Sequence, residues 1–206
     1  MNSMVNQVKS VPALLREVHP ALEELSRTVL HPELILSLKR IFITGCGDSH
    51  HATINTELAF ETLTGLPCET QQALQFARYS AGFIPQTGPN TNLVIGISVS
   101  GAVARTYEGM QLAKAAGATI LALSATPGSR VALAGDILFQ VPNPPFPDPE
   151  GVHTPGVRSF IVNQYALIMI AIRIGEVRGH ITSAQAADLR KELLGVADVI
   201  EQTIAE

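Results

Sequence analysis

Short runs of aliphatic residues, separated by segments with helical spacing, dominate the hydrophobic pattern of this chain. The clearest run is LVIGI at residues 93–97, in which four of the five side chains are large and aliphatic. A run that is apolar on both faces is typical of a strand buried in a parallel sheet. Comparable runs occur at residues 40–44, 66–71, 119–124 and 136–141, so the pattern predicts five strands.

Apolar residues at helical spacing lie before, between and after these runs. The predicted helices cover residues 5–30, 50–64, 73–79, a segment after the 93–97 strand that ends at Lys114, and residues 129–134, 157–174 and 183–203. Pro20 is expected to break or bend the first helix near His19, because proline removes a backbone donor. Gly65 is expected to end the second helix as its C-terminal cap.

Strands that alternate with helices form a parallel sheet covered by helices on both faces. The expected fold class is therefore α/β, a doubly wound five-stranded parallel sheet in the flavodoxin-like order 2-1-3-4-5. In that order the winding reverses between the first and third strands, and ligands bind there at the carboxyl ends of the strands. Residues 45–49 and 98–101 are the two loops expected at this point.

Both of these loops are rich in glycine and serine. Gly45-Cys46-Gly47-Asp48-Ser49 and Ser98-Val99-Ser100-Gly101 each follow a predicted strand and precede a predicted helix. The free N–H groups and the dipole at a helix N-terminus attract anions, and serine hydroxyls add donors. The pattern predicts a site for a phosphate carried on a small organic molecule, although Ser98 and Ser100 could alternatively be helix N-caps.

Composition and charge narrow the class of protein. The chain has 206 residues, of which 46% are hydrophobic and 16% charged, as in a compact fold whose sparse polar surface favours self-association. A net charge of −4 argues against a nucleic-acid partner. The N-terminus has no apolar secretion signal, and the apolar segment 160–174, interrupted by polar residues, is too short to span a bilayer. We expect a cytoplasmic homodimer or higher homo-oligomer with no membrane contact.

Three motifs resemble those of the SIS (sugar isomerase) domain family. IFITGCGDSHHA resembles its first loop, ISVSGAVART its second loop, and GVRSFIVNQYALIMI its later helix. The resemblance spans residues 39–174 and is closest to the isomerase half of glucosamine-6-phosphate synthase and to fructosamine-phosphate deglycases. It implies a phosphosugar-binding domain at residues 39–206, preceded by a helical arm at residues 1–38 that packs either on a partner subunit or on its own sheet.

The resemblance also implies which residues contact a sugar phosphate. By position in the motifs these are Gly47, Asp48, Ser49, Ser98, Val99, Ser100, Gly101, Val103, Arg105, Arg158 and Gln164. Val99 stands where a glutamine is common, and Asp48 and Val103 stand where threonines are common. A carboxylate beside a phosphate is repelled unless a cation stands between them, so Asp48 either pairs with Arg105 or accepts hydrogen bonds from sugar hydroxyls.

Isomerisation of a sugar phosphate needs a base to move a proton and an acid to polarise a carbonyl. Glu150 and His153, in the Pro- and Gly-rich loop before the 157–174 helix, are one candidate pair. His50, Glu57 and Glu61, on the helix after the first strand, are the rival candidates, and the sequence does not separate them. No metal ion and no cofactor are expected.

The expected function is that of a phosphosugar-binding protein in carbohydrate-derivative metabolism. One possibility is an aldose–ketose sugar-phosphate isomerase or an amino-sugar-phosphate deaminase or deglycase. The alternative is a non-catalytic sugar-phosphate sensor or binding module of the same fold, which the departures at Val99, Val103 and Asp48 favour.

Overall fold

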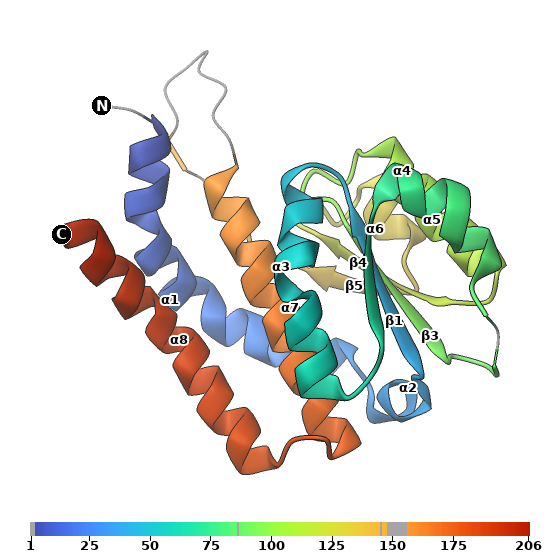
Figure 1. The fold of residues 1–206 in the computed structure, drawn as a ribbon. Helices are drawn as coiled ribbons and strands as arrows, with labels where there is room; N and C mark the ends of the chain where they lie inside the picture. The colour runs from blue at the N-terminus through green and yellow to red at the C-terminus, as the bar shows by residue number, and fades with distance from the viewer. Residues whose placement is uncertain (1–2, 86, 145, 148–155) are drawn as a thin grey trace.

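A five-stranded parallel sheet lies at the centre of the structure, a computed structural model that describes residues 3–85, 87–144, 146–147 and 156–206 (Figure 1). The strands are β1 (Arg40–Gly45), β2 (Cys68–Gln72), β3 (Asn92–Ile97), β4 (Thr119–Ser124) and β5 (Ile137–Gln140). Their order is β2-β1-β3-β4-β5, which confirms the predicted topology.

Strand β3 occupies the middle of the sheet and pairs with β1 on one side and β4 on the other. All six of its residues are buried, as expected for a strand covered on both faces. Gly45 pairs with Ile97, and Ile97 pairs with Leu123, so these three strands end in line. The loops that follow β1 and β3 therefore leave the same edge of the sheet side by side.

Most helices agree with the predicted segments. They are α1 (Ser3–Val29), α2 (Pro32–Ser37), α3 (Asp48–Thr64), α4 (Ala73–Gln75), α5 (Ala104–Ala115), α6 (Arg130–Ala134), α7 (Val157–Arg178) and α8 (Ser183–Ala205). The sequence pattern did not predict α2. The helix expected at residues 73–79 is one turn of α4 followed by a π-helical turn, Phe76–Ser80.

Two hydrophobic clusters pack on opposite faces of the sheet. Alternate strand residues such as Ile41, Ile43 and Leu93 join the larger cluster with α1, α3, α7 and α8, whereas Phe42 and Val94 point to a smaller cluster with α5 and α6. Figure 1 shows α1, α7 and α8 gathered on one side of the sheet and α5 on the other. The larger cluster accordingly joins the sheet to the helices from both ends of the chain.

Pro20 is expected to break or bend this helix near His19, and α1 is continuous through Pro12 and Pro20, so a break does not occur. Its axis instead changes direction along its length, as Figure 1 shows. Leu15, Val18 and Leu22 are fully buried, and α1 packs against α7 and α8. This packing holds the helix together despite the hydrogen bonds that the prolines remove.

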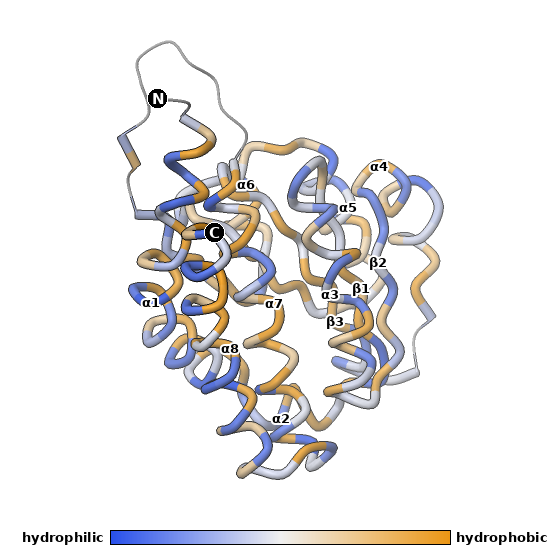
Figure 2. The backbone as a smooth tube through the Cα atoms, turned by 60° about the vertical axis from the view of Figure 1, so that its left-hand side comes forward, coloured by the Kyte–Doolittle hydropathy of each residue, from blue (hydrophilic) through white to orange (hydrophobic). Residues whose placement is uncertain are grey.

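Helix α7 is longer than predicted, at 22 residues. Its length and hydropathy would allow it to cross a membrane, so the expectation that this segment is too short was wrong. However, 61% of its most apolar window is buried inside the structure. In Figure 2 much of the α7 trace is coloured as hydrophobic, and the helix lies beside α1 and α8, as expected for a helix at the centre of a folded core.

The loop after β3 depends on Gly101. Its φ of 65° lies in the left-handed region, which favours glycine. Its N–H donates to the carbonyl of Ser98 at 3.0 Å, and its carbonyl accepts from the N–H of Val131 at 3.2 Å. A Cβ atom at this position would overlap the side chain of Ser129, which is the N-cap of α6.

We predict that Gly101→Ala lowers the free energy of unfolding by about 2–4 kcal/mol, because the left-handed backbone and the overlap with Ser129 both oppose a methyl group. Gly128→Ala is the matched control, since a Cβ there meets no atom within 4 Å and no positive φ is involved. Chemical denaturation of both variants tests this. Equal stabilities would show that the loop accommodates a side chain at Gly101.

Candidate functional site

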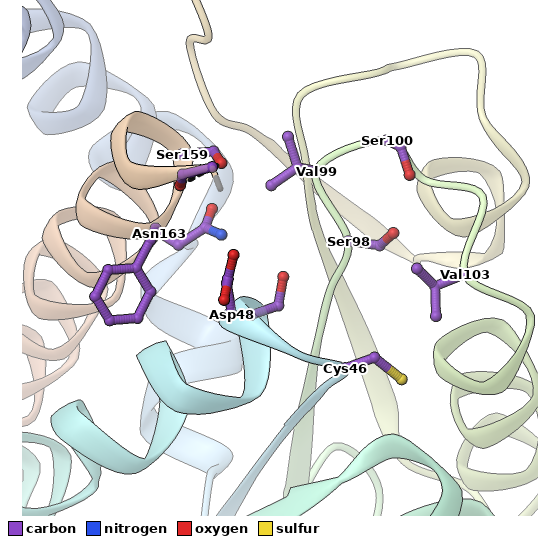
Figure 3. Close-up of a pocket in the computed structure, with 11 residues that line it drawn as sticks. Cys46, Asp48, Ser98, Val99, Ser100, Val103, Ser159 and Asn163 are labelled. Carbon is purple, nitrogen blue, oxygen red and sulfur yellow. Dashed lines mark hydrogen bonds between the residues drawn. The ribbon is translucent and has the colours of Figure 1, made fainter. Parts of the chain in front are cut away.

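A cavity of about 590 Å³ opens at the carboxyl ends of β1 and β3 (Figure 3). Its walls are the loop after β1 with the first turn of α3, the loop after β3, and the first turns of α7. The lining residues are Cys46, Asp48, Ser49, Ser98, Val99, Ser100, Val103, Gly156, Ser159, Phe160 and Asn163. The two serine-containing loops thus line one cavity, where the order of the strands reverses.

Ser98 lies at the base of the loop after β3 and is only 1% exposed. Its N–H donates to the carbonyl of Leu123 at 3.1 Å, which fixes the backbone. Its hydroxyl oxygen has no hydrogen-bond partner within the described ranges. A buried hydroxyl without a partner costs free energy, and a hydrogen bond to a ligand bound beside Ser98 would offset this cost.

The neighbouring residues shape the rest of this loop. The carbonyl of Val99 accepts hydrogen bonds from the N–H of Ala125 and the hydroxyl of Thr126, both at 3.2 Å, and so points away toward the loop after β4. The exposed Ser100 hydroxyl accepts from the N–H of Ala102 at 3.3 Å. Figure 3 shows Ser98 and Ser100 on one side of the cavity.

Neither serine caps α5. That helix begins at Ala104 after Val103, its N-cap residue, which provides no side-chain hydrogen bond. The alternative that Ser98 and Ser100 are helix N-caps is therefore wrong. Both serines precede the helix by several residues and belong to the loop that lines the cavity.

The second anion-binding feature is the N-terminus of α3. Its N-cap is Gly47, with φ 55°, and no side chain caps the first turn. The first N–H groups of a 17-residue helix, together with the positive end of its dipole, lie beside Asp48 and Ser49. Gly47 allows this sharp entry into the helix, since its φ is unfavourable for other residues.

Helix α7 forms the remaining wall through Ser159 and Asn163, which are one helical turn apart. Asn163 is only 2% exposed, and Ser159 donates a hydrogen bond to the carbonyl of Gly156 at 3.0 Å. Sequence reasoning missed both residues and selected the adjacent Arg158 and Gln164. Two polar side chains four positions apart on an apolar helix were the available signal, because such residues share one face.

The residues next to these two do not line the cavity. The guanidinium of Arg158 donates to the hydroxyl of Ser10 at 2.7 Å and lies 4.9 Å from the ring centre of Phe146. Burial lowers its pKa, although it stays charged at neutral pH. Gln164 is half-buried one position past Asn163 and is likewise absent from the wall. A rotation of about 100° per residue around the helix explains both cases.

Arg105 also points elsewhere. It is exposed on α5 and forms an ion pair with Glu108 at 2.5 Å, and Glu108 also pairs with Arg78 at 3.0 Å. The hydrogen bond from Arg105 holds the pKa of the Glu108 carboxyl below its usual range. The expected position of Arg105 between Asp48 and a bound anion is therefore not found. Gly47 and Gly101 shape the two loops but do not themselves line the cavity.

Of the candidate acid–base residues, those that the structure describes do not line the cavity. Glu150 and His153 lie outside the described residues. His50 is half-buried, with Nδ1 at 3.5 Å from the Thr53 hydroxyl, and its pKa is lowered by burial and then by the neighbouring His51. Glu57 accepts a hydrogen bond from Thr70 on β2, and Glu61 is exposed. Neither His50 nor the two glutamates of α3 are lining residues.

Two further observations concern metals and thiols. Within the described ranges, no group of three or more His, Cys, Asp or Glu side chains could hold a metal ion. Cys46 lines the cavity, and its sulfur lies 3.9 Å from the side-chain nitrogen of Gln72. Cys68 lies in the core, where burial raises the pKa of its thiol.

Comparison with known proteins agrees with this architecture. Residues 34–173 match the model of the SIS domain. Glutamine–fructose-6-phosphate aminotransferase [isomerizing] of Streptomyces coelicolor is 27% identical over 173 residues, which are 84% of this chain and 26% of that protein. The chain thus spans about a quarter of the length of this relative.

Solved structures share the fold. The C-terminal domain of glucosamine-fructose-6-phosphate aminotransferase from Francisella tularensis superposes with a TM-score of 0.76 at 20% identity, over 96% of this chain and 54% of that one. The Vibrio vulnificus NanR protein complexed with ManNAc-6P superposes with a TM-score of 0.60 at 15% identity, over 92% and 67% of the two chains. The family model matches more than half of the residues of this chain, which therefore belongs to the SIS domain family.

Proposed function

We propose that the cavity binds a hexose phosphate or amino-hexose phosphate and that the protein isomerises this sugar or removes its amine. The observation that carries the proposal is the buried, unpartnered hydroxyl of Ser98 in a cavity that also receives the N-terminus of α3. A phosphate supplies acceptor oxygens for that hydroxyl and negative charge for the helix dipole.

The size of the cavity fits this ligand class. A volume of about 590 Å³ lies within the usual range for small-molecule sites. The phosphate is assigned to the Ser98–Ser100 loop and the first turn of α3, and the sugar to the side formed by Ser159 and Asn163. The relatives named above support a sugar phosphate, since their names and bound ligand are of that class.

The acid–base pair is proposed from sequence position. Glu150 and His153 lie within six residues before Gly156, which lines the cavity, whereas His50 and Glu57 lie outside its wall. We therefore favour Glu150 and His153 as the groups that exchange protons with the sugar.

A non-catalytic sensor is the second candidate. It is favoured by one observation: the cavity wall within the described residues holds no histidine and only one carboxylate, that of Asp48. The similarity to NanR, solved with a bound sugar phosphate, is compatible with this reading. Proton exchange at C2 of glucose 6-phosphate or at C1 of fructose 6-phosphate in deuterated water separates the two candidates. Exchange identifies an isomerase, and binding without exchange identifies a sensor.

We predict that Ser98→Ala combined with Ser100→Ala weakens hexose-phosphate binding by about 10- to 100-fold, because hydrogen bonds to a charged group are lost. The Ser98 hydroxyl has no partner within the described residues, so its removal should leave the melting temperature unchanged or higher. Calorimetry and thermal unfolding measure the two effects.

Ser183→Ala, at an exposed position on α8, is the matched control for that double variant. Unchanged affinity in the double variant would refute the assignment of the phosphate to this loop. A loss of affinity accompanied by a lower melting temperature would point to damage to the fold instead.

We also propose that the protein is a cytoplasmic homodimer. The free thiols of Cys46 and Cys68 suit a reducing compartment. Val5, Val8 and Ile204 line an apolar groove between the start of α1 and the end of α8, and Val5 is 43% exposed. A second copy of the chain would cover these side chains. The division into an arm at residues 1–38 and a binding domain at residues 39–206 stays a prediction.

We predict that Val5→Glu shifts the protein from dimer to monomer, because the interface would have to desolvate a carboxylate, even with Lys9 lining the same groove. Glutamate is favourable in the first turn of a helix, so α1 should still fold. Leu58→Glu, at a 73% exposed position on α3, is the control. Light scattering gives the mass, and a monomeric parent protein or a dimeric Val5→Glu variant would contradict the proposed interface.

A further inference from the structure

Outside the cavity, a buried hydrogen bond joins His19 of α1 to Tyr165 of α7. The imidazole Nδ1 and the phenol oxygen are 2.5 Å apart, and the two rings meet edge to face. His19 is 8% exposed and Tyr165 is 3% exposed, so the bond is largely shielded from water. Within the described ranges, the Tyr165 hydroxyl has no other hydrogen-bond partner. The phenol therefore depends on the imidazole to accept its proton.

The hydroxyl of Tyr165 is the donor in this bond. Burial raises the pKa of the phenol above its usual range, so the phenol keeps its proton at neutral pH. If Nδ1 of His19 carried a proton as well, the proton of Tyr165 would be buried without an acceptor, which costs free energy. The bond therefore requires a neutral imidazole with its lone pair on Nδ1.

The charged side chains beside the ring also disfavour a proton on it. They come from α1, α7 and α8 and form one cluster: Glu23, Arg27, Arg173, Glu176 and Arg190. Glu23 lies 3.7 Å from Nε2 of His19, but it already pairs with Arg27 at 2.9 Å. It also lies 3.7 Å from Nε of Arg190. Three guanidinium groups and two carboxylates leave the cluster positive, and a proton on His19 would add to this excess.

The direction of the pH effect follows from these contacts. Burial lowers the pKa of His19; Glu23 opposes this shift, and Arg190 adds to it. The unfolded chain therefore binds the proton more readily than the folded protein does. Stability that depends on a neutral His19 is complete above about pH 6.5 and decreases as the pH falls below that value.

The bond lies where helix α1 is intrinsically weak. His19 directly precedes Pro20, which has no N–H, so the carbonyl of Arg16 lacks its usual helical donor. The axis of α1 also changes direction along its length (Figure 1). A side-chain bond to α7 at this point supports a segment whose own hydrogen bonding is incomplete.

We propose that the His19–Tyr165 hydrogen bond is an acid-sensitive contact that attaches α1 to α7. Protonation of His19 competes with the bond, because the imidazole loses the lone pair that accepts from Tyr165. Mild acid therefore favours a state in which α1 is loosened from α7 and α8. This inference goes beyond the proposed function and does not depend on what the cavity binds.

The experiment is thermal unfolding of the full chain at about pH 8 and about pH 5.5, on either side of the usual pKa of histidine. We expect the melting temperature of the parent protein to fall by at least about 2 °C more than that of His19→Asn. The asparagine amide can accept from Tyr165 but does not titrate. His31→Asn, at an exposed position, is the matched control and should keep the pH dependence of the parent protein.

Hydrogen exchange of the parent protein gives a second, local measurement. After correction for the intrinsic exchange rate, the amides of residues 18–22 should exchange faster at about pH 5.5 than at about pH 8, while those of α5 should not. This measurement decides the matter if His19→Asn does not fold. Equal pH dependence of the melting temperature in the parent protein and His19→Asn would show that other groups cause the acid effect. Either that result or unchanged exchange in α1 overturns the inference.

Discussion

The parallel pairing of β1 with β3 is the constraint on which the rest of the structure depends. Its register sets Gly45 beside Ile97, so two loops far apart in the sequence leave the sheet together. Because the chain winds in opposite directions from these two strands, their loops diverge and leave a space between them. The side chains of Ile41 and Ile43 on one face and Phe42 on the other hold this pairing between two hydrophobic clusters. The order of the strands and the packing of the core therefore account for the position of the cavity without any contribution from polar side chains.

The polar residues then decide what the space can hold. Ser98 is buried with its hydroxyl unpartnered, a cost that the core packing around β3 sustains. The N-terminus of α3 adds a partial positive charge, and Asp48 sets a full negative charge beside it. The two walls of the cavity therefore differ: the serine loop offers hydroxyl groups, and the side formed by α3 carries the carboxylate of Asp48.

Periodicity was sufficient to predict the five strands, and the flavodoxin-like order that fits five such strands then placed the two loops at the reversal of winding. Long apolar runs and glycines at turns are local signals, and β1, β3 and β4 follow them closely. Local signals failed where tertiary packing decides the outcome. The signal at Pro20 left a break or a bend open, and α1 stays continuous because burial of Leu22 against other helices outweighs the lost hydrogen bond. The sequence identified α7 as part of the site but selected Arg158 and Gln164, which do not line the cavity. The sequence alone does not determine which face of a helix is turned toward a cavity. Arg105 was misplaced for a related reason, as Glu108 lies one turn further along the same helix and pairs with it.

Helix α7 combines two tasks that are usually separated. Its first turns supply Ser159 and Asn163 to the cavity, while its remaining length is packed against α1, α3 and α8 at the centre of the molecule. A helix so enclosed has no freedom to swing, since any displacement would open voids along several neighbours at once. One wall of the cavity is consequently a rigid template. Ligands of different shape must therefore be accommodated on this wall by side-chain rotamers alone, and the helix itself sets how far the cavity extends on that side.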